Sequence, residues 1–177
     1  MKYVIDIIEN KSLTFGKLNQ IVSLKKQYWK YSHEEHIKWI HDNISENDYH
    51  LLLSDNSDNL LAYLNLVNVT INFGTDSQEY LGIGNVCVDI KVGAKGYGLL
   101  VMNLATFYLK QFAQPGILLC KQELNAFYQK TGWNIFVGNS FIANKLNHNS
   151  VFTTNKLVAT EIRSEEHTSE LQSPNTI

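Results

Sequence analysis

The stretch Asn85–Gly98, NVCVDIKVGAKGYG, decides the fold because a strand, a turn and a helix start follow one another in it directly. Its first half, as far as Ile90, is mostly apolar and predicts a strand. Its second half is rich in glycine, which is typical of a tight turn. The residues from Tyr97 to Phe112 are then apolar nearly all round, as in a helix buried against a sheet.

A turn of this kind suits an anion. N–H groups in the first turn of a helix have no partner inside the helix, and successive turn amides can surround a phosphate. Lys95 adds positive charge, and no arginine is available before Arg163. The turn residues alone leave a second interpretation open, which is a tight turn with a purely structural role.

The rest of the chain gives the pattern of a mixed sheet. Before the turn we expect strands at 3–8, 49–53, 60–73 and 79–90, a helix at 14–29, and a second helix from Ser32, where Glu35 completes a capping box. After it we expect a strand at 117–120, a helix at 124–131 ending at Gly132, and strands at 133–137 and 151–162. This order predicts an α/β (α+β) fold with a mixed central β-sheet flanked by helices.

Composition narrows the class of protein. The chain has 177 residues, is 44% hydrophobic and 18% charged, and carries a net charge of −2, which disfavours nucleic acid and anionic lipid as partners. It has no apolar run long enough for a membrane span and no signal-peptide pattern at its start. Two cysteines cannot form a disulfide framework, so we expect a cytoplasmic protein. The sequence leaves open whether the chain forms a homodimer.

The last residues differ from the rest. Of the 15 Lys and Arg residues only Arg163 is an arginine, and it opens the polar string RSEEHTSELQSPNTI. That string resembles a translated reading frame of a sequencing-library adapter. We therefore expect one domain at 1–162 and a disordered, non-native tail at 163–177; a natural disordered tail is the alternative.

A second block of residues carries a family resemblance. The turn Gly93-Ala-Lys-Gly96-Tyr-Gly98 is followed, after a further strand, by Asn125-Ala-Phe-Tyr128-Gln-Lys-Thr-Gly132-Trp133. In order and spacing these two blocks resemble the GNAT superfamily of acyl-CoA-dependent N-acyltransferases, which have Gln/Arg-x-x-Gly-x-Gly/Ala and then Asn-x-x-Ala…Tyr-x-x-x-Gly-Phe/Trp. Gly93 departs from the pattern, because the family usually has Gln or Arg there. A looser similarity is to the aminoglycoside 2′-N-acetyltransferases.

The resemblance implies acetyl-CoA as co-substrate and assigns residues to it. The backbone of three strand residues would pair with the pantetheine arm: Val86, Cys87 and Val88. The turn would hold the pyrophosphate: Gly93, Ala94, Lys95, Gly96, Tyr97 and Gly98. Asn125 would contact the cofactor, and Tyr128 would lie near the thioester sulfur.

Acetyl transfer to an amine by direct attack, through a tetrahedral intermediate, needs a neutral nitrogen, an oxyanion donor and a donor to the leaving thiolate. The Val88 amide suits the second role and Tyr128 the third. The base is less defined, because many relatives have Glu where this chain has Gly82 or Gly84. Of the nearby carboxylates we favour Asp89 over Glu79; a relayed water and a weakly basic substrate are the alternatives.

Three other features are interpreted structurally. The run Ser32-His-Glu-Glu-His36 lacks the i, i+4 spacing of a zinc helix, so we expect a helix cap and a solvated face and no metal. We expect the aromatic cluster of Tyr28, Trp29, Tyr31 and Trp39 to pack in the core, with a role in shaping an acceptor cleft as the alternative. Cys87 and Cys120 are expected as small buried apolar residues on neighbouring strands.

The sequence therefore predicts an N-acetyltransferase that moves an acetyl group from acetyl-CoA to a primary amine of a small molecule. Two alternatives stay open, which are a non-catalytic acyl-CoA-binding module and an acetyltransferase acting on a protein or an aminoacyl-tRNA. Residues 1–162 contain 14 basic and 14 acidic residues and no arginine, which weighs against the tRNA substrate.

Overall fold

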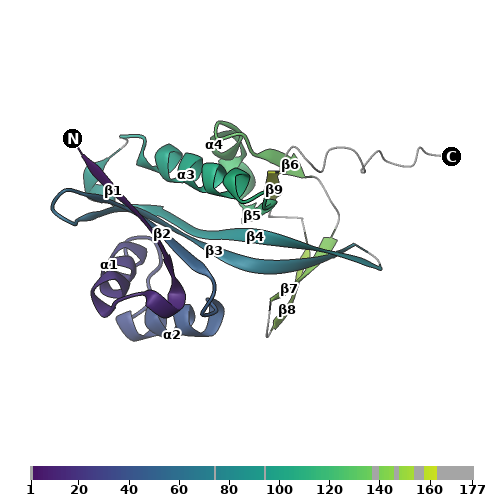
Figure 1. The fold of residues 1–177 in the computed structure, drawn as a ribbon, viewed down its shortest axis with the longest axis horizontal. Helices are drawn as coiled ribbons and strands as arrows, with labels where there is room; N and C mark the ends of the chain where they lie inside the picture. Colours follow the sequence, from purple (N-terminus) through teal and green to yellow (C-terminus); the bar gives the residue numbers. More distant parts are fainter. Residues whose placement is uncertain are drawn as a thin grey trace.

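The computed structural model describes residues 2–73, 75–93, 95–136, 140–145, 148–153 and 158–162, with side chains as far as Ile135 except at positions 72–74 and 94. It places one twisted sheet between two helical layers (Figure 1). The expected tail at 163–177 and the assignment of Ala94 lie outside the described residues. No helix in the described ranges is long and apolar enough to cross a bilayer.

The first part of the chain forms one helical layer and half of the sheet. Its elements are β1 (Tyr3–Glu9), η1 (Asn10–Ser12), α1 (Phe15–Lys25), α2 (His33–Asn43), β2 (Tyr49–Asp55), β3 (Leu60–Phe73) and β4 (Asp76–Val88). Thr14 caps α1 by accepting from the Lys17 N–H at 3.3 Å, and Ser32 and Glu35 form the expected capping box of α2. These two helix starts are confirmed.

The second part adds the other layer and the remaining strands. Its elements are η2 (Ile90–Val92), α3 (Tyr97–Gln111), β5 (Gly116–Cys120), η3 (Gln122–Leu124), α4 (Asn125–Gln129), β6 (Asn134–Phe136), β7 (Ser140–Lys145), β8 (His148–Thr153) and β9 (Val158–Ile162). The expected single strand at 151–162 is wrong, since β8 and β9 are separate strands with different partners. Strand β7 was not predicted.

One helix end also differs from expectation. Helix α1 stops at Lys25 instead of Trp29. The next residues form tighter turn bonds, such as the one from the Tyr28 N–H to the Lys25 carbonyl at 3.0 Å. The Tyr28 hydroxyl donates to the Val88 carbonyl at the end of β4, and the Gln27 side chain accepts from the Ile90 N–H at the start of η2. These long-range bonds compete with continuation of the helix.

The sheet has the mixed topology that the sequence predicts. Its order is β1-β2-β3-β4-β5-β9-β6, and β7 joins the far end of β3 and pairs with β8. Strands β4 and β5 are parallel and are joined by a crossover through α3, whereas the other pairs are antiparallel. Helices α1 and α2 cover one face, and α3 and α4 cover the other (Figure 1).

Each face of the sheet has its own apolar core. On the α3 side the core includes Val101, Met102 and Trp133, and on the α1–α2 side it includes Ile21, Ile40 and Leu52. Cys87 and Cys120 lie on the neighbouring strands β4 and β5 and are both buried, as expected, but in different cores. Burial raises the pKa of Cys87 to about 12, which fits an unreactive thiol.

Candidate active site

The parallel strands β4 and β5 separate halfway along. They pair from Leu81 to Ile83 on β4, and no strand in the described ranges continues this edge beyond Ile83. At the same place the register between β3 and β4 shifts, and Asn85 has a φ of +53°. A bulge of this kind bends a strand and increases its twist. It therefore opens a wedge between β4 and β5 in the middle of the sheet.

The main chain of Val88 faces this wedge. The Tyr28 hydroxyl donates to the Val88 carbonyl at 2.6 Å and accepts from the Val88 N–H at 3.4 Å, so both groups point away from β3. The Asp89 N–H bonds to the Leu61 carbonyl at 2.8 Å, which makes Tyr63 and Cys87 the next hydrogen-bonded pair of the antiparallel ladder.

Because hydrogen-bonded and non-hydrogen-bonded pairs alternate along β4, only some of the three strand residues assigned to the pantetheine arm have a free backbone edge. The backbone of Cys87 is committed to Tyr63 on β3. Val86, two residues before Val88, lies on the same edge as Val88. An extended ligand can therefore pair with Val86 and Val88 and not with Cys87.

The glycine-rich turn closes one end of the wedge. Gly93 has a φ of +64° and Gly96 a φ of +81°, values that L side chains adopt with strain, and the space around both is open. Helix α3 begins just after Gly96 and leaves its first-turn N–H groups unused inside the helix. The Lys95 side chain is exposed, but the Lys95 N–H is bonded to the Gly93 carbonyl at 2.8 Å.

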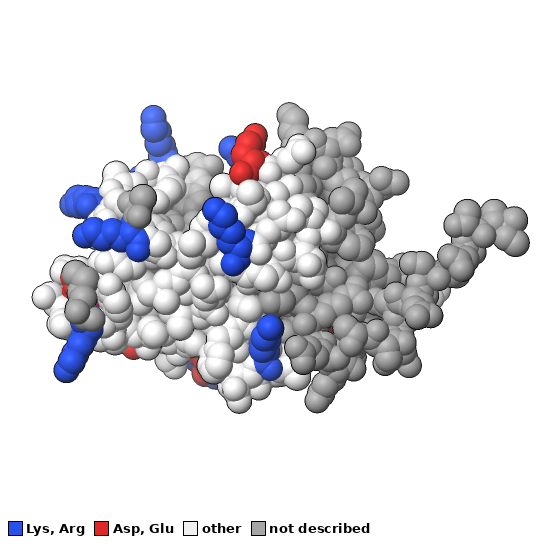
Figure 2. Space-filling view, turned by 90° about the horizontal axis from the view of Figure 1, so that it is seen from above, with Lys and Arg blue, Asp and Glu red and all other residues white. Residues whose placement is uncertain are grey.

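The charge around the turn fits an anionic ligand. Figure 2 looks onto the face that carries α3 and α4, where blue lysine side chains predominate over red acidic ones in the described part. Gly93 has no side chain that could donate a hydrogen bond to a phosphate. A pyrophosphate would therefore be bound by the N-terminus of α3 and by lysines.

Tyr128 is on helix α4, in the apolar core on the α3 side of the sheet. It is 6% exposed, and burial raises its pKa to about 12. The hydroxyl therefore stays protonated at neutral pH and is able to donate to a developing thiolate. Asn125 lies one helical turn earlier, and its Oδ1 is 3.6 Å from the Cys120 Sγ, which donates to it.

Phe127, which sequence reasoning missed, links these parts. A side chain placed on Gly98 would meet the Phe127 ring at 3.3 Å and the Val88 side chain at 3.6 Å. The start of α3, the wedge edge of β4 and helix α4 therefore meet at one point. The structure brings the turn, Val88 and the helix that carries Tyr128 close together.

The two carboxylates considered as bases lie away from the bulge. Asp89 caps η2 by accepting from the Lys91 N–H at 3.0 Å. Glu79 accepts from the Thr70 hydroxyl at 2.5 Å, near the start of β4. Each carboxylate has a structural bond, and the residues at the bulge itself carry no acid.

A cavity of about 320 Å³ lies on the α1–α2 side of the wedge. Strands β3, β4 and β5 form its floor, and Trp39 of α2 contributes to its wall. Gly82 and Gly84 line it, and the Asn85 Nδ2 donates to the Asn65 Oδ1 at 2.5 Å within it. Tyr128 belongs to the core on the opposite face, so the wedge separates the cavity from Tyr128.

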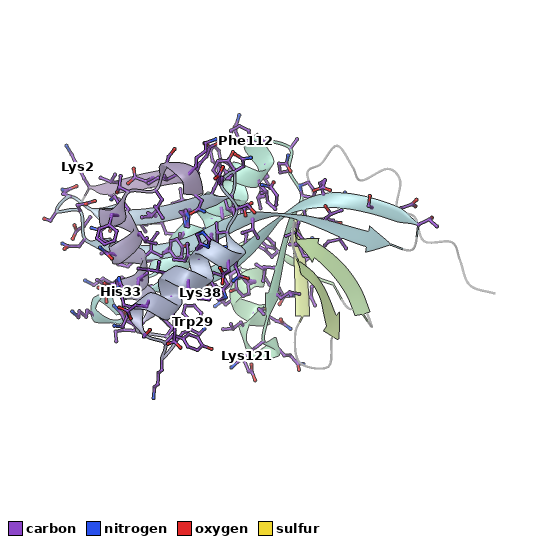
Figure 3. All side chains as sticks on the ribbon, turned by 90° about the horizontal axis from the view of Figure 1, so that it is seen from below. Lys2, Trp29, His33, Lys38, Phe112 and Lys121 are labelled. Atoms are coloured by element: carbon purple, nitrogen blue, oxygen red, sulfur yellow. The ribbon has the colours of Figure 1, made fainter. Side chains whose placement is uncertain are left out.

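The aromatic cluster does not pack in the core as a unit, contrary to expectation. Trp39 is 40% exposed and lines the cavity, and Tyr28 and Tyr31 are also exposed. Trp29 packs against the core of the α1–α2 face and lies with His33 at the connection between these helices (Figure 3).

The face expected to be solvated on α2 is also partly buried. His36 is 2% exposed, and its Nε2 lies 3.2 Å from the Trp29 carbonyl. In the described residues no group of three or more His, Cys, Asp or Glu side chains is placed to hold a metal ion.

Lys25 is the unusual charge near this site. Its side chain is 2% exposed, and its Nζ lies 4.0 Å from the centre of the Trp39 ring and 5.9 Å from that of Trp29. Burial lowers the pKa of Lys25 to about 8. A cation therefore lies behind the tryptophan that forms the cavity wall.

Comparison with known proteins rests on structure. No protein-family model matches the chain, and no curated protein sequence matches it. An acyl-CoA N-acyltransferase from Pseudomonas aeruginosa matches with a TM-score of 0.63 at 15% identity, over 90% of this chain and 99% of that chain. Escherichia coli ElaA matches with a TM-score of 0.62 at 16% identity, over 90% and 99% of the two chains.

A third solved structure is a GNAT family N-acetyltransferase, YhbS from Escherichia coli, in complex with CoA. It matches with a TM-score of 0.60 at 14% identity, over 90% of this chain and 81% of that chain. The chain therefore has the fold of the GNAT acyl-CoA N-acyltransferases, and the resemblance stated from the sequence is confirmed at the level of the fold. At these identities the likeness concerns the fold alone.

Proposed function

We propose that this chain is an N-acetyltransferase that moves an acetyl group from acetyl-CoA to a primary amine of a small molecule. The observation that carries the proposal is the wedge between β4 and β5, because it joins an open strand edge, a helix N-terminus and a protonated tyrosine. The fold shared with a CoA-bound N-acetyltransferase supports it.

The chain's residues suit the parts of acetyl-CoA. Val86 and Val88 would pair with the pantetheine arm as an added strand would. The turn from Gly93 to Gly98 and the first turn of α3 would hold the pyrophosphate, with Lys95 beside it and Asn125 at the other end. Bound there, acetyl-CoA supplies an activated acyl group with a thiolate leaving group.

Three groups would assist the transfer. The Val88 N–H would stabilise the oxyanion, and the Tyr128 hydroxyl would donate its proton as the carbon–sulfur bond breaks. The proton lost by the amine would pass to Asp89 or to water in the cavity. Asp89 is the carboxylate next to Val88, although one of its oxygens accepts from Lys91.

A non-catalytic acyl-CoA-binding module is the second candidate. It is favoured by one observation, which is that none of the residues lining the cavity is acidic or otherwise able to act as a base. Release of free thiol from acetyl-CoA across a panel of primary amines separates the two functions. Thiol release that depends on the amine supports the enzyme, whereas CoA binding without release with any amine supports the module.

A further inference from the structure

The cavity beside the wedge has a composition that selects among amines. Most of its lining is aliphatic or aromatic, and the aliphatic residues come from β3, β4 and β5: Val67, Val69, Ile71, Ile83, Ile117, Leu118 and Leu119. The polar side chains in it, Asn65 and Asn85, bond to each other. No lining residue carries a charge. A cationic group placed here would lose its hydration without gaining a counter-ion, which is costly.

Two glycines keep the cavity open. A Cβ on Gly82 would lie 2.9 Å from the Val69 side chain and 3.2 Å from that of Val67. A Cβ on Gly84 would lie 3.3 Å from the Asn65 Oδ1. Both glycines are on the same face of β4, at alternate positions. Any other residue at these two positions would fill the space that a substrate group would need.

Lys25 adds an electrostatic reason. Its ammonium lies 4.0 Å from the centre of the Trp39 ring, and Trp39 contributes to the cavity wall. No ion pair to Lys25 occurs in the part of the chain that the structure describes. A second cation in the cavity would be repelled across the ring, in a region of low dielectric constant.

From these observations we infer that the acceptor is an aromatic amine: its uncharged ring lies in the cavity against Trp39 and its nitrogen faces the wedge. This inference rests on the proposed function and specifies its substrate. The nitrogen of an arylamine is uncharged at neutral pH, so its lone pair is free without prior loss of a proton. The transfer then balances: the carbon–nitrogen bond forms, the carbon–sulfur bond breaks, and Tyr128 protonates the departing thiolate. The proton lost by the amine passes to Asp89 or to water and from there restores the Tyr128 hydroxyl.

The first experiment compares aniline with cyclohexylamine, which has a ring of the same size but is cationic at neutral pH, and with spermidine, which is polycationic. We expect kcat/KM for thiol release to be higher with aniline than with either cation by about a hundredfold or more. Faster release with cyclohexylamine or spermidine overturns the inference and leaves the proposed function intact.

A binding experiment keeps the inference testable without turnover. Calorimetry of the protein saturated with CoA is carried out with aniline and with cyclohexylamine. Tighter binding of aniline than of cyclohexylamine supports the cavity assignment. It does so even when no amine releases thiol, because the lack of thiol release would contradict only the proposed enzyme activity. Equal affinity for the two rings, or tighter binding of the cation, overturns the assignment.

Two variants locate the site. Trp39→Ala removes a partly exposed side chain from the cavity wall. It should lower the affinity for aniline about tenfold and leave the affinity for CoA within about twofold of the wild type. Tyr31→Ala is the matched control, since Tyr31 is an exposed aromatic residue between the same two helices and does not line the cavity. Gly82→Ala should act like Trp39→Ala by filling the cavity. Unchanged aniline affinity in both Trp39→Ala and Gly82→Ala would refute the placement of the ring.

Discussion

Replacing Lys25 by methionine should stabilise the protein. Lys25 is 2% exposed, its ammonium lies against aromatic rings with no counter-ion among the described residues, and its pKa falls from 10.5 to about 8. One pKa unit corresponds to about 1.4 kcal/mol, so the shift amounts to about 3 kcal/mol against the charged form. Methionine has a similar shape and removes this cost. It also forgoes the contact with Trp39, worth about 1 kcal/mol, so we expect a net gain of about 1–2 kcal/mol.

The pH dependence gives a second, independent signature. Since the pKa of Lys25 is lower in the folded protein, the unfolded chain binds more protons between pH 8 and 10.5, and stability contributed by this residue rises with pH. The contribution should grow by about 1 kcal/mol between about pH 7 and pH 9 in the wild type and vanish in Lys25→Met. Cys87 acts in the opposite direction, with a pKa raised from 9.0 to about 12, but mainly above pH 9.

Urea unfolding followed by tryptophan fluorescence at several pH values measures both effects. Lys26→Met is the matched control, because Lys26 is exposed and the same charge is lost one residue further along. We expect that control to leave stability within about 0.5 kcal/mol of the wild type at every pH. A Lys25→Met protein that is less stable than the wild type, with the same pH dependence, would show that the buried ammonium is not destabilising.

Three further predictions concern the proposed site and the chain end. Tyr128→Phe should lower thiol release about a hundredfold with little change in acetyl-CoA affinity, because the phenyl ring keeps the packing and loses the donor; unchanged turnover in the same assay removes Tyr128 from the mechanism. Gly96→Val should weaken CoA binding about tenfold or more in calorimetry, because a branched side chain at a φ of +81° strains the turn, and full affinity would contradict the phosphate assignment. Deletion of residues 163–177 should leave the melting temperature and activity unchanged, and a drop of several degrees would show that the tail is native and packed.

Local signals made much of the fold predictable. The caps at Thr14 and Ser32, the glycine-rich turn and the apolar helix after it depend on residues close together in the chain. The parallel pair of β4 and β5 follows from the strand–helix–strand order alone. The separate strands β7, β8 and β9 were missed because their positions depend on pairing with distant segments, such as β3 and β5.

Side-chain environments that depend on distant contacts were harder to predict. The sequence analysis assigned no role to Lys25 and interpreted His36 as part of a solvated face, yet both are buried where α1 and α2 meet. Gly82 and Gly84 were interpreted only as positions where many relatives have the base. Their second effect, the room for a cavity, becomes visible only when β3 is placed beside them. The turn and Tyr128 could be identified from the sequence because each belongs to a motif, and the two motifs follow one another in the order typical of the GNAT superfamily.

The bond between the Tyr28 hydroxyl and Val88 has a thermodynamic consequence for any ligand that uses this strand edge. Such a ligand replaces the Tyr28 hydroxyl as the hydrogen-bond partner of the Val88 N–H and carbonyl. The net gain in binding free energy from these two hydrogen bonds is therefore small. Its observed dissociation constant equals the intrinsic one divided by the fraction of molecules in which the phenol has swung aside. Affinity at this site is therefore set partly by the conformational equilibrium of the segment after α1, well away from the phosphate-binding turn.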